Sequence, residues 1–226
     1  VWRALFLRLL FCVSPLAIFL GVVFFLSRKN PRAGQRGRVA SGLGLIILAL
    51  QLIQIATQPI VTAAGTRVLF GSLSGDPMLD MLIGALFTVL SWSSLAVVLL
   101  TASLAASLVI SVPVAVCLVL GANLGSGLIG LLATFNMPGG GRRVALGNLC
   151  FKLSGCVIFS LALPLALQAI AYLDEDPRRQ VLHFHVIFNV VLALGFLFFT
   201  DRIAALVERW FPEATVAGGQ VVEPRH

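Results

Sequence analysis

Long apolar segments, nearly free of charged residues, constrain this chain more than any other feature. A membrane-spanning helix needs about 20 apolar residues. Segments of about that length or longer recur along the sequence, at residues 9–26, 39–56, 79–110, 114–135, 144–172 and 184–200. Charged residues make up 11% of the chain, against about 25% in a soluble domain. The composition therefore excludes an ordinary soluble enzyme and indicates an integral membrane protein.

Most of the charged residues lie in the gaps between the apolar segments. The net charge of +7 is also found in nucleic-acid-binding proteins, but its placement here follows the positive-inside rule. Basic residues without acids cluster at 28–38 and at 142–143, whereas residues 174–176 are acidic. We therefore predict that both basic segments are cytoplasmic loops or turns, that residues 174–176 face outside, and that nucleic acid is not a partner.

Residues suited to covalent or metal chemistry are not gathered in this sequence. The four cysteines lie inside apolar segments without a Cys-x-x-Cys pair, and the three histidines do not join them in a ligand pattern. Free cysteine in such a setting acts as a small apolar residue. No nucleophile–base pair or carboxylate pair stands at a common depth. We therefore predict that the chain is not an enzyme and has no catalytic residues and no cofactor.

Two apolar segments have polar centres. Residues 79–110 are too long for one span and too short for two, and Ser91-Trp92-Ser93-Ser94 lies in their middle. This pattern predicts two half-helices that form a re-entrant hairpin, a backbone that is tolerated at membrane depth where protein or water covers it. Residues 121–127, Gly-Ala-Asn-Leu-Gly-Ser-Gly, interrupt the next segment. We expect a broken helix there.

Paired breaks at matched depth are typical of ion and substrate sites in secondary transporters. Half-helix ends offer free N–H groups to an anion, and hydroxyl and carbonyl oxygens suit a hard cation such as sodium. The alternative is close helix packing, because small residues also let membrane helices approach each other. The transport interpretation predicts that the 91–94 turn and the 121–127 break lie close together near the middle of the membrane.

The residues around these breaks resemble a known family. Leu118–Gly127, L-V-L-G-A-N-L-G-S-G, is similar to the Gly-Ala-Asn signature of the sodium-dependent phosphate cotransporter family. Ser91–Ser94 stands where that family has Gln-Ser-Ser-Ser, and residues 42–52, 142–155 and 185–190 resemble its other helices. The sequence departs from the family pattern at several positions: Trp92 replaces the glutamine, Leu95 replaces the third serine, Ser126-Gly127 replaces Thr-Thr, and Lys152 replaces a common asparagine.

The resemblance implies an all-α polytopic transmembrane bundle that forms one half of an inverted-repeat transporter. Residues 1–36 would be an N-terminal span and a basic cytoplasmic loop, residues 37–212 the cotransporter-like repeat, and residues 213–226 a polar tail. We expect the chain to be part of a longer protein, with the second repeat half in the same chain or in a dimer partner. The resemblance also implies secondary transport of inorganic phosphate across the inner (plasma) membrane, coupled to sodium. The alternative is a non-transporting membrane subunit or scaffold.

The resemblance also assigns candidate site residues. Phosphate would contact Ser93, Ser94, Gly125, Ser126 and Lys152. Sodium, as the coupling ion, would be held by Ser93, Asn123 and Ser126. With Trp92 in place of glutamine, one amide ligand is missing, which bears on the use of sodium.

Three polar side chains within the apolar segments have two interpretations each. Lys152 either extends its ammonium group toward the cytoplasmic interface or faces the anion site. His185 and Asn189 share one helix face at i, i+4, and we expect a packed, hydrogen-bonded pair in preference to a proton relay. The lipid bilayer, phosphate and sodium are the expected partners.

Overall fold

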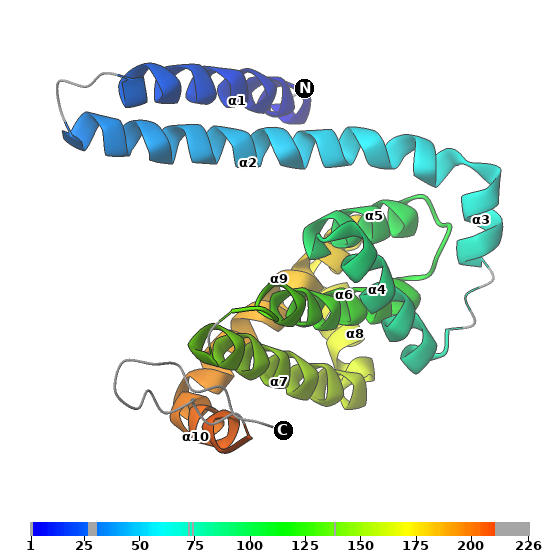
Figure 1. The fold of residues 1–226 in the computed structure, drawn as a ribbon. Coiled ribbons are helices and arrows are strands. Elements are labelled where there is room, and N and C mark those ends of the chain that lie inside the picture. The colour runs from blue at the N-terminus through cyan, green and yellow to red at the C-terminus, as the bar shows by residue number, and fades with distance from the viewer. Residues whose placement is uncertain (1, 27–30, 72, 74, 138, 211–226) are drawn as a thin grey trace, which may run out of the picture. The chain divides into compact units, whose positions relative to one another are not determined.

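The computed structural model describes residues 2–26, 31–71, 73, 75–137 and 139–210. The chain divides into two compact units, Val1–Ile60 and Val61–His226, and each is considered by itself. Among the described residues every regular element is helical (Figure 1), which confirms the predicted all-α class. The predicted division at residue 36 stays a prediction, and the predicted tail at 213–226 lies outside the described residues.

Two antiparallel helices form the first unit, α1 (Trp2–Leu26) and α2 (Pro31–Thr62). Their backbones touch at small residues, since a Cβ on Gly21 would lie 2.5 Å from the backbone N of Ser41. The predicted basic loop is wrong over residues 31–38, because α2 starts at Pro31 and includes them. Proline is well suited to a first helical position, and the alanine, glutamine and arginines that follow are helix formers.

The second unit contains the remaining helices. After the short α3 (Ala64–Gly71), the chain runs through α4 (Pro77–Ser91), α5 (Ser94–Ala106), α6 (Val112–Ala133), α7 (Gly139–Leu161), α8 (Leu163–Leu173), α9 (Pro177–Phe196), a 3-10 turn (Leu197–Phe199) and α10 (Thr200–Trp210).

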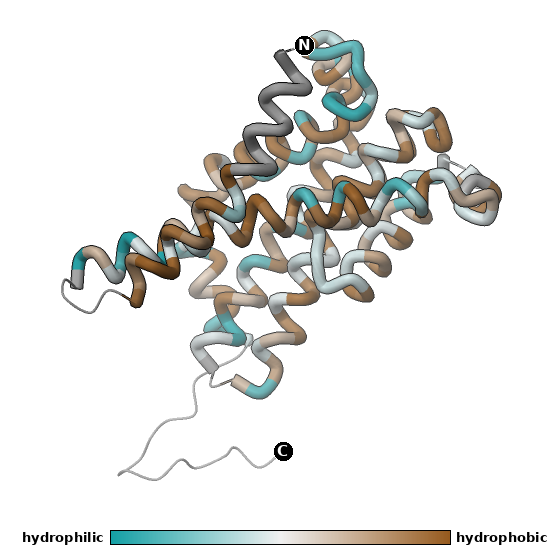
Figure 2. The backbone as a smooth tube through the Cα atoms, turned by 90° about the horizontal axis from the view of Figure 1, so that it is seen from above, coloured by the Kyte–Doolittle hydropathy of each residue, from teal (hydrophilic) through white to brown (hydrophobic). Residues whose placement is uncertain are grey.

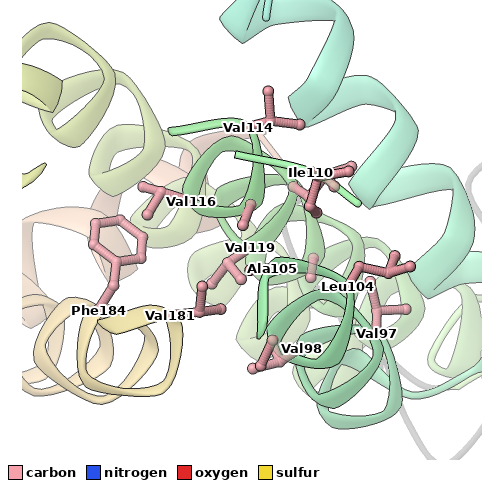
Figure 3. Close-up of a cluster of buried hydrophobic side chains, with 14 of the residues drawn as sticks. Val97, Val98, Leu104, Ala105, Ile110, Val114, Val116, Val119, Val181 and Phe184 are labelled. Atoms are coloured by element: carbon pink, nitrogen blue, oxygen red, sulfur yellow. The ribbon is translucent and has the colours of Figure 1, made fainter. Parts of the chain in front are cut away.

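Helix α6 is the centre of the second unit. It packs against α4, α5, α7 and α9, and its residues from Val114 to Asn123 are all buried. Figure 3 shows part of this core, where side chains of α5, α6 and α9 such as Val98, Val119 and Val181 meet. A helix that is apolar all round and surrounded by other helices is typical of the buried centre of a bundle.

The helical hairpin predicted at Ser91–Ser94 is confirmed. Helix α4 ends at Ser91 and α5 starts at Ser94. Trp92 takes the left-handed conformation with φ of 52°, which is uncommon for a bulky residue and marks a sharp turn. Ser93 caps α5, because its Oγ accepts a hydrogen bond of 3.2 Å from the Ala96 N–H. The re-entrant placement of this hairpin in the membrane stays a prediction.

The broken helix predicted at residues 121–127 is wrong. Helix α6 continues without interruption from Val112 to Ala133, and the glycines at 121, 125 and 127 serve close packing instead. A Cβ on Gly121 would lie 2.0 Å from the Met81 carbonyl oxygen, and one on Gly84 would lie 2.1 Å from that of Leu118. These glycines therefore let the backbones of α4 and α6 touch. A helix break occurs elsewhere, at Ala162 between α7 and α8, just before Pro164; proline lacks the N–H needed to continue the bonding.

Among the described residues, four helical segments are long and apolar enough to cross a membrane: Arg32–Thr62, Val112–Ala133, Gly140–Leu161 and Pro177–Trp210. Figure 2 shows the hydrophobic stretches along these helices, separated by shorter hydrophilic ones. In the α6 span, 67% of an 18-residue apolar stretch is buried within the protein, whereas in the α7 span the buried share is 17%. Helices α7 and α9 therefore expose apolar side chains in the way lipid-facing helices do, and the chain is a membrane protein.

The arrangement of α7, α9 and α10 gives a topology prediction. The acidic loop 174–176 directly precedes α9, whereas α10 follows α9 and packs beside the start of α7, where a Cβ on Gly147 would lie 3.8 Å from Ile203. The 20 residues of α9 span about 30 Å, close to the hydrocarbon thickness. In a cysteine-free background, Glu175→Cys should react with an impermeant thiol reagent added outside, and Arg142→Cys should not. Equal labelling of both positions in intact cells would contradict this topology.

Candidate functional site

Asn123 stands at the centre of a polar cluster within the core of the second unit. It lies on α6 and is 1% exposed. Its Nδ2 donates to the Val119 carbonyl oxygen at 2.9 Å and lies 3.4 Å from Nδ1 of His185, while its Oδ1 accepts a hydrogen bond of 3.1 Å from Nδ2 of Asn189. A buried amide needs such partners, so α6 and α9 are tied together at this point.

His185 and Asn189 provide the α9 side of the cluster. Nδ2 of Asn189 donates to the His185 carbonyl oxygen at 2.8 Å and lies 3.5 Å from the His185 ring nitrogen. The predicted hydrogen-bonded pair is therefore confirmed. Sequence reasoning missed their shared partner Asn123, which is 62 and 66 positions away along the chain. The available signal was that all three are polar residues within apolar segments.

Ser126 and Lys152 extend the cluster to α7. Oγ of Ser126 donates to the Asn123 carbonyl oxygen at 2.7 Å and accepts a hydrogen bond from Nζ of Lys152. The Lys152 side chain also lies along α6, since a Cβ on Gly127 would meet its Cδ at 3.4 Å. Its ammonium group thus points to α6, as the anion-site interpretation requires. Among the described residues, no carboxylate lies within ion-pair distance of Lys152.

The hairpin turn lies near this cluster but is not hydrogen-bonded to it. Gly125 packs against α4, because its Cβ would lie 2.7 Å from Cβ of Thr88. Ser91 Oγ in turn donates to the Thr88 carbonyl oxygen at 3.3 Å. Ser93 and Ser94 are half-buried. Ser126 therefore links Asn123 to Lys152, and the hairpin approaches the same stretch of α6 through Thr88.

The cluster is rich in hydrogen-bond donors. It combines an ammonium group, a serine hydroxyl, two amides and an imidazole, which are groups that suit an oxyanion. The oxygens of Asn123 and Ser126 are the type that sodium prefers, although Oδ1 of Asn123 already accepts from Asn189. In the part of the chain that the structure describes, no three His, Cys, Asp or Glu side chains gather as metal ligands.

These features define a helical membrane protein with a polar, cationic, partly buried site between its helices. The family model for the Na+/Pi-cotransporter matches residues 57–202. Since this match covers more than half of the chain, the chain belongs to that family. The match includes the hairpin, α6 and every member of the polar cluster.

Relatives from three bacteria are similar to most of the chain. A protein of Escherichia coli O157:H7 named "Putative inorganic phosphate export protein YjbB" is 53% identical over 192 residues, which is 85% of this chain and 35% of the relative. Its namesake in Salmonella typhimurium is 52% identical over 198 residues, 87% of this chain and 36% of the relative. YqeW of Bacillus subtilis is 26% identical over 193 residues, 85% and 62% of the two chains.

The chain spans about a third of the length of the YjbB relatives it matches. No solved structure matches it.

Proposed function

We propose that this chain supplies half of a secondary transporter that moves inorganic phosphate across the inner (plasma) membrane. The observation that carries the proposal is the contact between Lys152 and Ser126 beside the buried Asn123. Family membership and the name of the YjbB relatives support the same substrate. The other half of the transport pathway would come from the same polypeptide or from a dimer partner.

The charge of Lys152 is the physical basis for phosphate as the substrate. A cation held between membrane helices is expensive unless an anion or strong acceptors compensate it. Ser126 is a neutral acceptor, and it leaves the positive charge of Lys152 uncompensated among the described residues. A phosphate oxygen that replaces this acceptor would gain a charge-assisted hydrogen bond. A bound phosphate would therefore supply the negative charge that compensates Lys152.

The hairpin turn would complete the anion site. Ser93 and Ser94 stand at the start of α5, where the first backbone N–H groups of the helix and its positive dipole end are available. Gly125 keeps the hairpin close to the α6 residues of the cluster. Ser93 and Ser94 would thus bind phosphate together with Ser126 and Lys152. This assignment predicts that the turn contacts the substrate from the α4–α5 side.

Sodium is the proposed coupling ion. Ser93, Asn123 and Ser126 offer hydroxyl and amide oxygens, which suit a hard cation. Trp92, 60% exposed, occupies the place where the family has a glutamine, so this chain would hold sodium with one amide fewer. Sodium use is therefore a separate part of the proposal from phosphate transport, and the experiment treats the two separately.

Flux measurements test both parts. The protein is expressed from the complete reading frame that contains this chain and reconstituted into lipid vesicles loaded with radiolabelled phosphate. We expect saturable phosphate flux above that of protein-free vesicles, with sulfate as a poor competitor, and faster flux in sodium than in potassium. Equal rates in the two salts would overturn sodium coupling alone. Flux no greater than in empty vesicles would overturn phosphate transport and leave the scaffold alternative.

A further inference from the structure

Asp80 is a buried carboxylate that the phosphate cluster does not use. It lies in the first turn of α4 and is 0% exposed. Neither of its carboxylate oxygens has a hydrogen-bond partner in the part of the chain that the structure describes. The other buried residues of α4 are Gly84, Ala85 and Thr88, and the glycine contacts place this face against α6. The carboxyl group is therefore enclosed between two tightly packed helices.

Among the side chains that the structure describes, none with a positive charge lies within ion-pair distance of Asp80. On α6 the titratable group that faces it is the thiol of Cys117, which is 2% exposed and feels the charge of Asp80. Asp76, the residue that caps α4, is a second acid close by. Helix α5 carries no titratable side chain. Helix α7 reaches α4 through Ser160, whose Oγ contacts the sulfur of Met81. Lys152 lies on α7 about two turns before Ser160.

A bare carboxylate at this position would be strongly disfavoured. Transfer of an unpaired ion into an apolar environment is so costly that such a group takes up a proton instead. Sodium needs several oxygen ligands and the space to hold them, whereas the backbones of α4 and α6 touch at Gly84 and Gly121. A proton needs neither space nor further ligands. The enclosed carboxyl group therefore fits a proton better than a metal ion.

We propose that Asp80 is a proton-binding site whose occupancy depends on the packing of α4 against α6. The carboxylate takes a proton from water when α4 closes onto α6, and the O–H bond breaks to return that proton to water when the two helices separate. One proton is thus bound and one released in each cycle. The inference rests on the proposed transport function and adds the proton as a coupling ion for the hairpin's movement.

Thr88 gives independent support for a second arrangement of this interface. It lies about two turns beyond Asp80 on the same face of α4 and is 0% exposed. Its Oγ1 also has no hydrogen-bond partner among the described residues. Buried polar groups without partners are rare in native structures and call for an explanation. Two on one helix face are explained if that face becomes hydrated in another state of the transport cycle.

Infrared difference spectroscopy tests the site without any need for transport. In the purified protein in lipid vesicles, the protonated carboxyl band should be present at neutral pH, shift in heavy water, and be lost in Asp80→Asn. Asparagine has the shape of the neutral acid, so the variant should fold. The control Asp201→Asn removes an exposed carboxylate on α10 and should keep the band. A band absent from the wild type, or retained in Asp80→Asn, would overturn the proposal.

Flux driven by a pH gradient tests the coupling. One proton per phosphate should change the phosphate ratio across the membrane by about tenfold per pH unit, and Asp80→Asn should lose this dependence while it still exchanges phosphate. Phosphate itself changes charge near neutral pH, so the comparison of wild type with Asp80→Asn isolates the carboxyl group. Equal dependence in both proteins, or loss of sodium dependence alone in Asp80→Asn, would overturn the proposal. Absence of any flux would overturn phosphate transport, and the infrared result would still decide the state of Asp80.

Discussion

Gly121→Ala should destabilise the second unit strongly, by about 3 kcal/mol or more. The added Cβ would lie 2.0 Å from the Met81 carbonyl oxygen and 2.9 Å from the backbone N of Ala85. Overpacking of a core costs about 1–3 kcal/mol when side chains can adjust. Here the obstacle is the backbone of α4, so the helix itself has to move away from α6. The measurement is the thermal unfolding midpoint of the purified protein in detergent.

Gly130 provides a matched control on the same helix. A Cβ at Gly130 has nothing within 4 Å, and both glycines are interior positions of α6. Alanine favours a helix over glycine by up to about 1 kcal/mol, so Gly130→Ala should be neutral or stabilising. If Gly121→Ala unfolds at the same temperature as Gly130→Ala, the close contact between α4 and α6 is not present in the folded protein.

The same glycines show where sequence reasoning reached its limit. A polar and glycine-rich stretch within an apolar segment fits both a helix break and a close helix contact. At Ser91–Ser94 the break interpretation was correct, because the serines there cap α5 and hold the turn. At Gly121–Gly127 it was wrong, because carbonyl oxygens of α4 occupy the space next to Gly121 and Gly125. The choice depended on a neighbouring helix that local sequence does not specify.

The residues of the polar cluster could be predicted from the sequence, whereas the contacts between them could not. Asn123, Ser126, Lys152, His185 and Asn189 stand out as polar residues in apolar segments. Their meeting depends on how α6, α7 and α9 pack, which follows from the buried faces of all three helices together. Asp80 carried the same signal, as a single acid at the start of an apolar segment, but its burial without a polar partner among the described residues follows from the packing of α4 against α6.

Lys152→Met should weaken phosphate binding by about 10- to 100-fold. Hydrogen bonds to charged groups contribute about 1.5–3 kcal/mol, and each 1.4 kcal/mol is tenfold in affinity. Methionine keeps an unbranched apolar chain of similar length, so the contact with α6 near Gly127 is largely preserved and folding should change little. Lys152→Arg keeps the charge and should retain more of the affinity than Lys152→Met does.

Ser154→Ala is the matched control for this substitution. Ser154 lies two positions further along α7, and its Oγ donates locally to the Cys150 carbonyl oxygen at 2.9 Å. Its loss removes one neutral hydrogen bond from the same helix, worth about 1 kcal/mol of stability, without a change in charge. Phosphate affinity should therefore be that of the wild type.

Equilibrium binding of radiolabelled phosphate to the reconstituted protein tests the central claim, that Lys152 is the cation of a phosphate site. The account predicts that Lys152→Met, but not Ser154→Ala, lowers the affinity by at least about tenfold at an unchanged unfolding temperature. Wild-type affinity in a folded Lys152→Met protein would contradict it and would leave the contact between Lys152 and Ser126 as a packing interaction between α6 and α7.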